Sequence, residues 1–204
     1  MSQLDVAQLN FSYGENSLFK DFHLSLKAGE VGALLGPSGS GKSSLLHLIC
    51  GFLNPQSGQI LIGGEDVTAL PPEERNVGVV FQDHALFPHM SVSENVGFGV
   101  RSPSAERERI IHRYLELVHL ADRGKSMPSE LSGGECQRIA IARCLAAEPK
   151  ILLLDEAFSS LDEELRLELR EDVKKIISEA GLTTLLVTHS ADEAKSFSDR
   201  IFHL

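Results

Sequence analysis

The stretch of sequence that decides the fold is Gly36-Pro37-Ser38-Gly39-Ser40-Gly41-Lys42-Ser43. It fits the phosphate-binding pattern G-x-x-x-x-G-K-[ST] without deviation. The glycines let the backbone bend so that successive N–H groups point inward at an anion. In this pattern the lysine reaches the outer phosphates of a nucleotide, and the hydroxyl of the last serine ligates magnesium. Residues 36–43 are therefore predicted to bind phosphate and are called the phosphate loop below.

The segments on either side of the phosphate loop support this interpretation. An apolar run at residues 31–35 precedes it, and apolar residues at helical spacing follow from Ser44 to Cys50. A strand that feeds a glycine loop and opens a helix is the context that the pattern requires, because the helix N-terminus adds partial positive charge. The alternative, a glycine-rich turn with an incidental lysine, is the weaker explanation in this context.

A second glycine motif is Leu131-Ser132-Gly133-Gly134-Glu135, which precedes a strong helical pattern. A hydroxyl and two glycines again expose N–H groups at a helix start, so the motif is a second candidate phosphate site. Taken alone, it is explained equally well as a helix N-terminus in which Ser132 and Glu135 form a capping box.

Two carboxylates follow a buried strand. The apolar run Ile151-Leu152-Leu153-Leu154 is typical of a buried parallel strand, and it ends in Asp155-Glu156. Carboxylates in such a place are costly unless they meet a cation or polar partners. We expect Asp155 to hold the magnesium hydration shell and Glu156 to orient and deprotonate an attacking water.

Together the three motifs resemble the ATP-binding cassette (ABC) ATPases, the nucleotide-binding subunits of ABC transporters. The resemblance runs from about Leu4 to the end of the chain, and it implies ATP and Mg²⁺ as cofactors. It also implies a ring that stacks on adenine, a glutamine that links magnesium and water to the membrane partner, a loop after the catalytic glutamate and a histidine at the γ-phosphate. The residues that match these roles are Tyr13, Gln82, Ser160-Leu161-Asp162 and His189.

The resemblance therefore implies a full set of site residues. The catalytic residues are Glu156, His189 and Gln82, and the metal ligands are Ser43, Gln82 and Asp155. The nucleotide contacts are Tyr13, the phosphate loop with Ser44, Gln82, Asp155, Ser132, Gly133, Gly134, Glu135, Asp162 and His189.

Three of these residues have ordinary structural alternatives. Tyr13 could simply end an alternating strand, and Gln82 could be a strand-end amide. His189 could be a helix-entry residue, because Ser190 and Asp192 follow it. The place of Gln82 and His189 after predicted strands favours function, since ligands of open α/β sheets bind at the carboxyl ends of strands.

The predicted fold is α/β, of the ABC type of P-loop ATPase: a mostly parallel core sheet, an N-terminal antiparallel β-subdomain and a helical subdomain. We expect one domain over 1–204, in which about 1–90 and 148–204 form the core and β-subdomain. Residues of about 91–147 form the helical subdomain with the second glycine motif. No C-terminal regulatory domain is expected, and the sequence leaves open whether the chain is truncated or a minimal version.

Composition limits the classes of partner. The formal charge of −10 weighs against nucleic-acid binding and against direct anchoring on anionic lipid. No apolar stretch approaches the roughly 20 residues of a membrane span, and the N-terminus lacks signal-peptide character. Cys50, Cys136 and Cys144 show no C-x-x-C spacing, which argues for a reducing compartment and against a metal site. We expect a cytoplasmic protein, peripheral on the inner face of the membrane through protein partners.

Two phosphate-binding motifs far apart in one chain predict an ATP-dependent homodimer. In a head-to-tail pair the phosphate loop of one chain faces residues 131–135 of the other around a two-fold axis. Loss of the γ-phosphate removes charge-assisted hydrogen bonds, so the dimer should loosen on hydrolysis.

The segment after Gln82 is apolar for a loop. It would expose Leu86, Phe87 and Met90 in a monomer, which suggests a partner surface. The resemblance implies that transmembrane permease subunits dock there, with a substrate-binding protein as an indirect partner. Residues 70–89 are similar in sequence to the ATPases of bacterial importers for ferric iron, thiamine, polyamines, sulfate or molybdate. The short length of the chain favours iron(III) or thiamine as the substrate.

The main alternative function is a soluble ABC ATPase in an assembly process such as iron–sulfur cluster biogenesis. Relatives in DNA repair carry a coiled-coil insertion, and those in translation carry two cassettes, so they fit this chain less well. Two departures from the family pattern leave the ATPase rate open. Ala157 replaces a usual proline, and Cys136 stands where glutamine or arginine is common.

Overall fold

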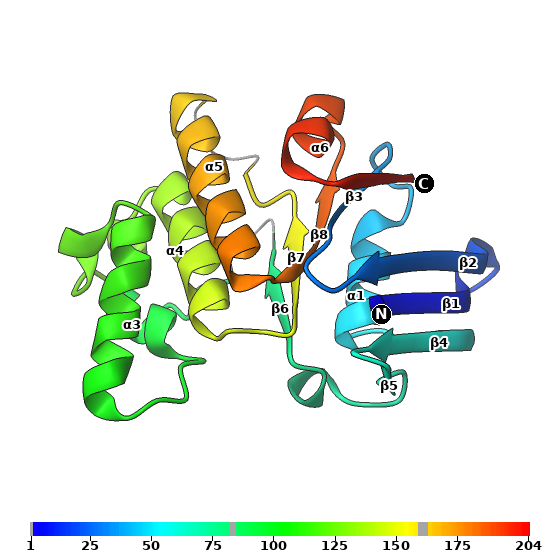
Figure 1. Ribbon diagram of the computed structural model, residues 1–204, viewed down its shortest axis with the longest axis horizontal. Coiled ribbons are helices and arrows are strands. Elements are labelled where there is room, and N and C mark those ends of the chain that lie inside the picture. The colour runs from blue at the N-terminus through cyan, green and yellow to red at the C-terminus, as the bar shows by residue number, and fades with distance from the viewer. Residues whose placement is uncertain (1, 82–84, 159–162) are drawn as a thin grey trace. The chain divides into compact units, whose positions relative to one another are not determined.

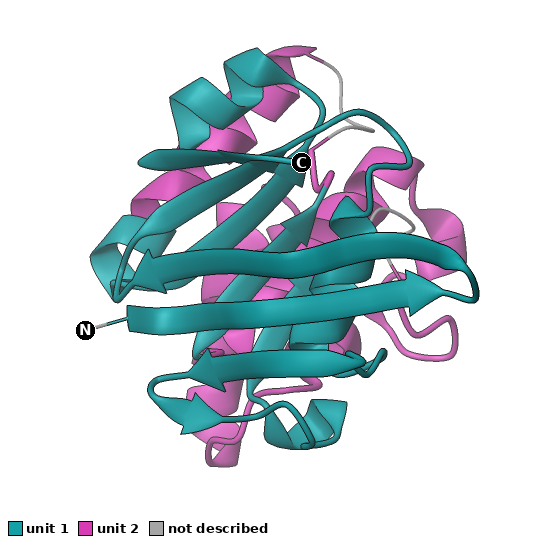
Figure 2. Ribbon diagram, turned by 90° about the vertical axis from the view of Figure 1, so that its right-hand side faces the viewer, with its two compact units in different colours: residues 1–79, 150–155, 176–204 teal, residues 80–149, 156–175 magenta. Residues whose placement is uncertain are grey.

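The computed structural model describes residues 2–81, 85–158 and 163–204. The chain forms two compact units (Figures 1 and 2). Unit 1 contains residues 1–79, 150–155 and 176–204, and unit 2 contains residues 80–149 and 156–175. Among the described residues, no helix combines the length and apolar character needed to cross a bilayer.

An antiparallel sheet of unit 1 contains β1 (Ser2–Tyr13), β2 (Asn16–Lys27), β4 (Ser57–Ile62) and β5 (Glu65–Asp66), in the order β2-β1-β4-β5. In β1 the buried side chains are Leu4 and Val6, then Leu9 and Phe11. The alternation changes phase at Gln8, which has a left-handed φ of 52° at an irregularity of the pairing. The bulge keeps all four apolar side chains buried although their spacing is not strictly two.

The second sheet contains β3 (Val31–Leu35), β6 (Val77–Val80), β7 (Ile151–Asp155), β8 (Thr183–Thr188) and β9 (Arg200–His203). The strand order is β6-β7-β8-β3-β9, and β3 pairs in parallel with both β8 and β9. Every residue of β7 and β8 is buried, as expected for central strands covered on both faces. Helix α6 (Ala191–Phe197) packs against β3 and β8.

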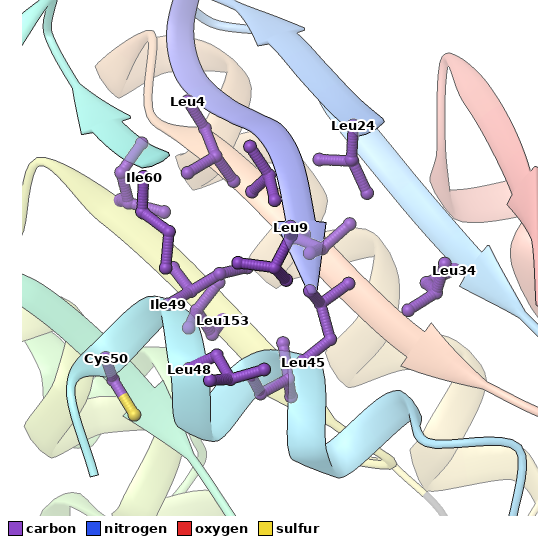
Figure 3. Close-up of a cluster of buried hydrophobic side chains, with 14 of the residues drawn as sticks. Leu4, Leu9, Leu24, Leu34, Leu45, Leu48, Ile49, Cys50, Ile60 and Leu153 are labelled. Carbon is purple, nitrogen blue, oxygen red and sulfur yellow. The ribbon is translucent and has the colours of Figure 1, made fainter. Parts of the chain in front are cut away.

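Helix α1 (Lys42–Cys50) lies in the hydrophobic core of unit 1 (Figure 3). Leu45, Leu48 and Ile49 of this helix belong to one cluster with side chains of β1, β4 and β7. Because protein interiors are close-packed, a helix held on several sides cannot shift without moving the core. The core therefore fixes the helix that begins at the phosphate loop.

Unit 2 is mainly helical. It contains α2 (Val92–Gly97), α3 (Ser104–Leu117), α4 (Gly133–Ala146) and most of α5 (Glu163–Ala180), and α2 packs against both α3 and α4. Single-turn 3₁₀ helices occur at η1 (Pro72–Glu74) in unit 1, and at η2 (Ala121–Arg123) and η3 (Pro128–Glu130) in unit 2.

Candidate nucleotide-binding site

The strand register of unit 1 places predicted site residues at one edge of the parallel sheet. Leu35 of β3 lies opposite Thr188 of β8, and Asp155 of β7 lies opposite Val187. Because parallel strands share a direction, the phosphate loop, Asp155 and His189 all lie at the carboxyl edge. This is where ligands bind in open α/β sheets.

The backbone of the phosphate loop depends on its glycines. Gly39 and Gly41 have left-handed φ angles of 81° and 101°, which glycine adopts without strain. A Cβ on Gly41 would come within 2.9 Å of Leu18, and a Cβ on Gly36 would lie 2.7 Å from the hydroxyl of Ser40. A side chain at either position would therefore disturb the loop.

Lys42 and Ser40 are two polar side chains of the loop whose surroundings suit an anion. Lys42 is only 6% exposed, and its Nζ donates to the carbonyl oxygens of Gly36 at 2.9 Å and Pro37 at 2.8 Å. The ammonium group is thus held over the loop. The buried hydroxyl of Ser40 has no hydrogen-bond partner among the residues that the structure describes. A phosphate oxygen would supply the acceptor that this hydroxyl lacks, so the residues present fit the phosphates of ATP.

The start of α1 is suited to an anion. Gly41 is the N-cap residue and provides no side-chain cap, and the first turn contains no acidic residue. The N–H groups there are left to an outside acceptor, and the helix dipole favours negative charge. Ser43 is exposed in this turn and Ser44 is half-buried.

Tyr13 lies next to this helix start. Its hydroxyl is 3.4 Å from Oγ of Ser44, and its ring meets Phe11 edge-on with centroids 4.9 Å apart. The side chain is 52% exposed although it ends β1. An exposed ring beside a phosphate loop can stack on a base, whereas a residue that merely ends a strand has no need of this contact.

Asp155 and Glu156 occupy different environments. Asp155 ends β7 and is only 9% exposed. Glu156 follows with a left-handed φ of 48°, and its carbonyl oxygen accepts a hydrogen bond of 3.4 Å from Nε2 of Gln137. Gln137 was not expected from the sequence, because its complete burial on the otherwise apolar buried face of α4 is visible only in the fold.

His189 is exposed and lies between the end of β8 and the start of α6. Ser190 is the N-cap residue of α6, because its Oγ accepts a hydrogen bond of 3.2 Å from the Glu193 N–H. The Ser190 N–H in turn donates to Oγ1 of Thr188 at 3.0 Å. The helix-entry role therefore belongs to Ser190.

The second glycine motif lies in unit 2 and does form a capping box. Oγ of Ser132 accepts from the Glu135 N–H at 3.2 Å, and the Ser132 N–H donates to Oε2 of Glu135 at 2.8 Å. The Ser132 N–H and hydroxyl lower the pKa of Glu135, so its carboxylate is ionised at neutral pH. The cap uses the Glu135 N–H and leaves those of Gly133 and Gly134 to other acceptors. The capping and phosphate-binding interpretations are therefore compatible.

A family model described as "ABC transporter" matches residues 19–159. The chain belongs to the ABC transporter family. It is 46% identical to the spermidine/putrescine import ATP-binding protein PotA of Mannheimia succiniciproducens, over 98% of this chain and 55% of that protein. It is 47% identical to the Fe(3+) ions import ATP-binding protein FbpC of Agrobacterium fabrum, over 93% of this chain and 55% of that protein. The cassette spans about half the length of these curated relatives.

Solved structures show the same fold. The cassette superposes with a TM-score of 0.88 and 32% identity on a dimeric post-hydrolysis state of the ATP-binding cassette MJ0796 bound to ADP and Pi, covering 98% of this chain and 94% of that one. Another dimeric structure of MJ0796, described as a bacterial ABC transporter cassette, gives a TM-score of 0.89 at 32% identity. The predicted family, fold and ATPase type of domain are confirmed.

Gln82 and the predicted loop Ser160-Leu161-Asp162 lie outside the described residues of the cassette. Their roles stay predictions. Of the two departures from the family pattern, Ala157 is fully buried, and Cys136 places its Sγ 3.7 Å from the carbonyl oxygen of Pro128. Burial raises the pKa of the Cys136 thiol, so it is protonated at neutral pH and adds no charge near Ser132.

Proposed function

We propose that this cassette is the ATP-hydrolysing subunit of a bacterial importer, which couples ATP binding and hydrolysis to substrate uptake. The strand register carries the proposal, because it gathers the phosphate loop, Asp155 and His189 at one sheet edge. The import ATP-binding proteins among the relatives support the transport role.

Each residue at this edge of the sheet has a separate role in the proposed reaction. The loop N–H groups and Lys42 bind the phosphates, and the ring of Tyr13 stacks on adenine. Ser43 and Asp155, with Gln82, would hold Mg²⁺, and the charge of the ion would offset that of the β- and γ-phosphates. His189 contacts the γ-phosphate.

Glu156 is the proposed general base. Its carboxylate orients the attacking water and takes its proton as the bond from the water oxygen to the γ-phosphorus forms. The bond between the γ-phosphorus and the β–γ bridging oxygen breaks in the same step, so that ADP and phosphate are the products. The left-handed backbone at Glu156 and the hydrogen bond from Gln137 to its carbonyl oxygen fix where the side chain begins. Such positioning matters because a general base must reach the proton within hydrogen-bond distance.

We further propose that two copies pair head-to-tail when ATP is bound. Residues 132–135 of each copy then complete the phosphate site of the other. The capping box supports this, since it holds the start of α4 rigidly while Gly133 remains exposed. The dimeric state of the MJ0796 structures also supports it.

The dimer is tested with Ser132→Arg. In a background of Glu156→Gln with saturating ATP, the parent is expected to shift from monomer to dimer. Adding Ser132→Arg should prevent the shift, because the larger side chain would occupy the place of the γ-phosphate of the partner's nucleotide. Light scattering with and without ATP measures the mass.

Ser91→Arg is the matched control. Ser91 forms the same capping box with Glu94 at the start of α2, so its replacement also removes a cap and adds an arginine in unit 2. This variant should dimerise normally. A dimer that forms equally well with Ser132→Arg would contradict the head-to-tail arrangement.

The proposed permease-docking surface is the Phe87 cluster, defined as Phe87, Phe98 and Arg143. The rings of Phe87 and Phe98 are 4.4 Å apart, and the guanidinium of Arg143 lies 5.2 Å from the centre of the Phe87 ring. Phe98 is 59% exposed. An exposed ring backed by a second ring and a cation is a rigid surface for an apolar partner.

The expectation that Leu86, Phe87 and Met90 are exposed was wrong in degree, because all three are half-buried. The reason is Asn95, a fully buried residue of α2. Its amide accepts from the Phe87 N–H and donates to the carbonyl oxygens of Phe87, Met90 and Ser91. The loop is thereby folded against α2, and Phe98 becomes the more exposed ring.

Docking is tested with Phe98→Ser. Basal ATP hydrolysis of the isolated chain should stay within about twofold of the parent, since an exposed ring contributes little to the fold. Recovery of the chain with its permease in membrane fractions, and uptake, should fall strongly. The control is Leu167→Ser, which removes another exposed apolar side chain, on α5. Normal membrane recovery of Phe98→Ser would refute docking through the Phe87 cluster.

Permease subunits would hold the cassette at the inner face of the membrane, and a substrate-binding protein would act only through them. The cargo is a separate question, because the relatives are named for polyamines, ferric iron and sulfate or thiosulfate at similar identity. Ferric iron is among these names, and thiamine stays a prediction from sequence. A soluble assembly ATPase would instead co-purify without a membrane protein.

A further inference from the structure

We propose that Arg75 is a positioning residue for nucleotide binding. Arg75 anchors the C-terminal end of α1 and thereby fixes the phosphate loop at the other end of that helix. Arg75 follows η1 and comes shortly before β6. Nothing about its place in the sequence, between two glutamates and a strand, distinguishes it from a surface arginine. In the structure it is 1% exposed, among the largest fully buried side chains.

The guanidinium binds the open end of α1 directly. Its Nη1 donates to the carbonyl oxygens of Leu48 at 2.8 Å and Ile49 at 3.0 Å. These belong to the last four carbonyls of the helix, which have no partner within it. The His47 carbonyl oxygen is bound instead by the backbone N–H groups of Phe52 and Leu53. Arg75 therefore completes the C-terminal end of α1.

The other side of the same guanidinium holds a separate segment. Nε donates to the carbonyl oxygen of Leu70 at 2.8 Å, and Nη2 donates to that of Thr68 at 2.8 Å. One planar group thus ties α1 to residues 68–70 through four hydrogen bonds in fixed directions. A lysine could not reproduce this, because an ammonium group lacks the rigid fork of donors.

The charge of Arg75 is compensated by backbone carbonyl groups, two of them at the end of α1 and two in residues 68–70. Within the described residues it makes no ion pair, and burial lowers its pKa from the usual range. The charged or titratable neighbours that oppose this shift are Cys50 and Asp66. The C-terminal end of a helix carries partial negative charge, so a cation is stabilised there.

Gly51 gives an independent indication that the guanidinium of Arg75 belongs at the C-terminal end of α1. Gly51 ends α1 with a left-handed φ of 88°. A Cβ on it would lie 2.6 Å from Nε and 2.8 Å from Cζ of Arg75. Moving the guanidinium aside would cost free energy, because its four hydrogen bonds would be lost.

The two ends of α1 are mechanically linked. The helix has nine residues, about 13.5 Å of length, so its ends move together. Lys42 and Ser43 begin the helix, and Arg75 holds its last turn. A small rotation or shift at the Arg75 end would therefore displace the Lys42 ammonium and the loop N–H groups from the phosphates.

The test measures nucleotide affinity in Arg75→Lys and Gly51→Ala, and it rests on the proposed ATP binding. Fluorescent ATP and ADP analogues are titrated with Mg²⁺, well below the melting temperature of each variant. We expect both nucleotides to bind about 10- to 100-fold more weakly, since small misplacements of binding groups have effects of this size. The ratio of ATP to ADP affinity should not change, because the whole loop moves rather than one γ-phosphate contact.

The control separates positioning from loss of stability. Ile111→Ala removes packing from the buried face of α3 in unit 2 and should lower the melting temperature while leaving affinity unchanged. Hydrogen exchange provides the second readout. In Arg75→Lys it should accelerate at residues 47–53 and also at residues 42–46, at the nucleotide end of α1. Gly51→Ala disturbs the contact between α1 and the guanidinium while Arg75 itself is retained. If Arg75→Lys does not fold, the nucleotide affinity of Gly51→Ala is compared with that of the parent instead.

Two results would overturn the proposal. The first is a folded Arg75→Lys variant with parental affinity for both nucleotides, and the second is a loss for ATP alone. A parent chain that binds no ATP would instead contradict the proposed function. In that case the exchange of residues 42–46 still decides whether Arg75 controls α1.

Discussion

Replacing Glu156 with glutamine is expected to leave ATP binding intact and to slow ATP hydrolysis by about 10²- to 10⁴-fold, the usual contribution of a general base. The amide has nearly the same shape and can still orient a water, but it cannot take the proton. Because the left-handed backbone and the Gln137 contact involve main-chain atoms of Glu156, the substitution leaves both in place. Turnover is measured as phosphate release at saturating ATP.

Glu148→Gln is the matched control for this experiment. Glu148 has the same φ of 48° and is exposed, so its substitution removes one charge from the same backbone conformation. It should hydrolyse ATP at the parental rate. If Glu156→Gln also turned over within a few-fold of the parent, Glu156 would not be the base.

Replacing Lys42 with alanine is expected to weaken ATP binding by about 10- to 100-fold, since hydrogen bonds to charged groups contribute about 1.5–3 kcal/mol each. The structure gives a second reason for a large effect. The Lys42 ammonium also holds the carbonyl oxygens of Gly36 and Pro37, so its loss leaves the loop less ordered before the nucleotide arrives. Fluorescence titration with ATP measures the affinity.

Lys20→Ala changes the net charge of the chain by the same amount at an exposed position of β2, and it should leave affinity unchanged. The comparison removes any general effect of charge on an anionic ligand. Unchanged affinity in Lys42→Ala would mean that residues 36–43 are not where ATP binds.

The features that the sequence determined are local ones. The phosphate loop requires glycines and a lysine at fixed spacing, because its backbone angles and its anion contacts arise within a few residues. The capping box at Ser132 and Glu135 is local for the same reason, and the spacing of the two residues indicated it as one of two explanations of the motif. The apolar run at residues 31–35 likewise predicted a strand, and that at residues 151–154 predicted a buried one, since central parallel strands are covered on both faces.

Other features depend on which backbone atoms meet across long sequence separations, and only the tertiary structure decided these. The register that sets Leu35 against Thr188 joins segments more than a hundred residues apart. The buried roles of Arg75, Asn95 and Gln137 could not be predicted, because a polar side chain can be buried only where the fold supplies matching acceptors and donors. Those partners are mostly carbonyl groups, which every residue carries, so the sequence contains no pattern that marks them.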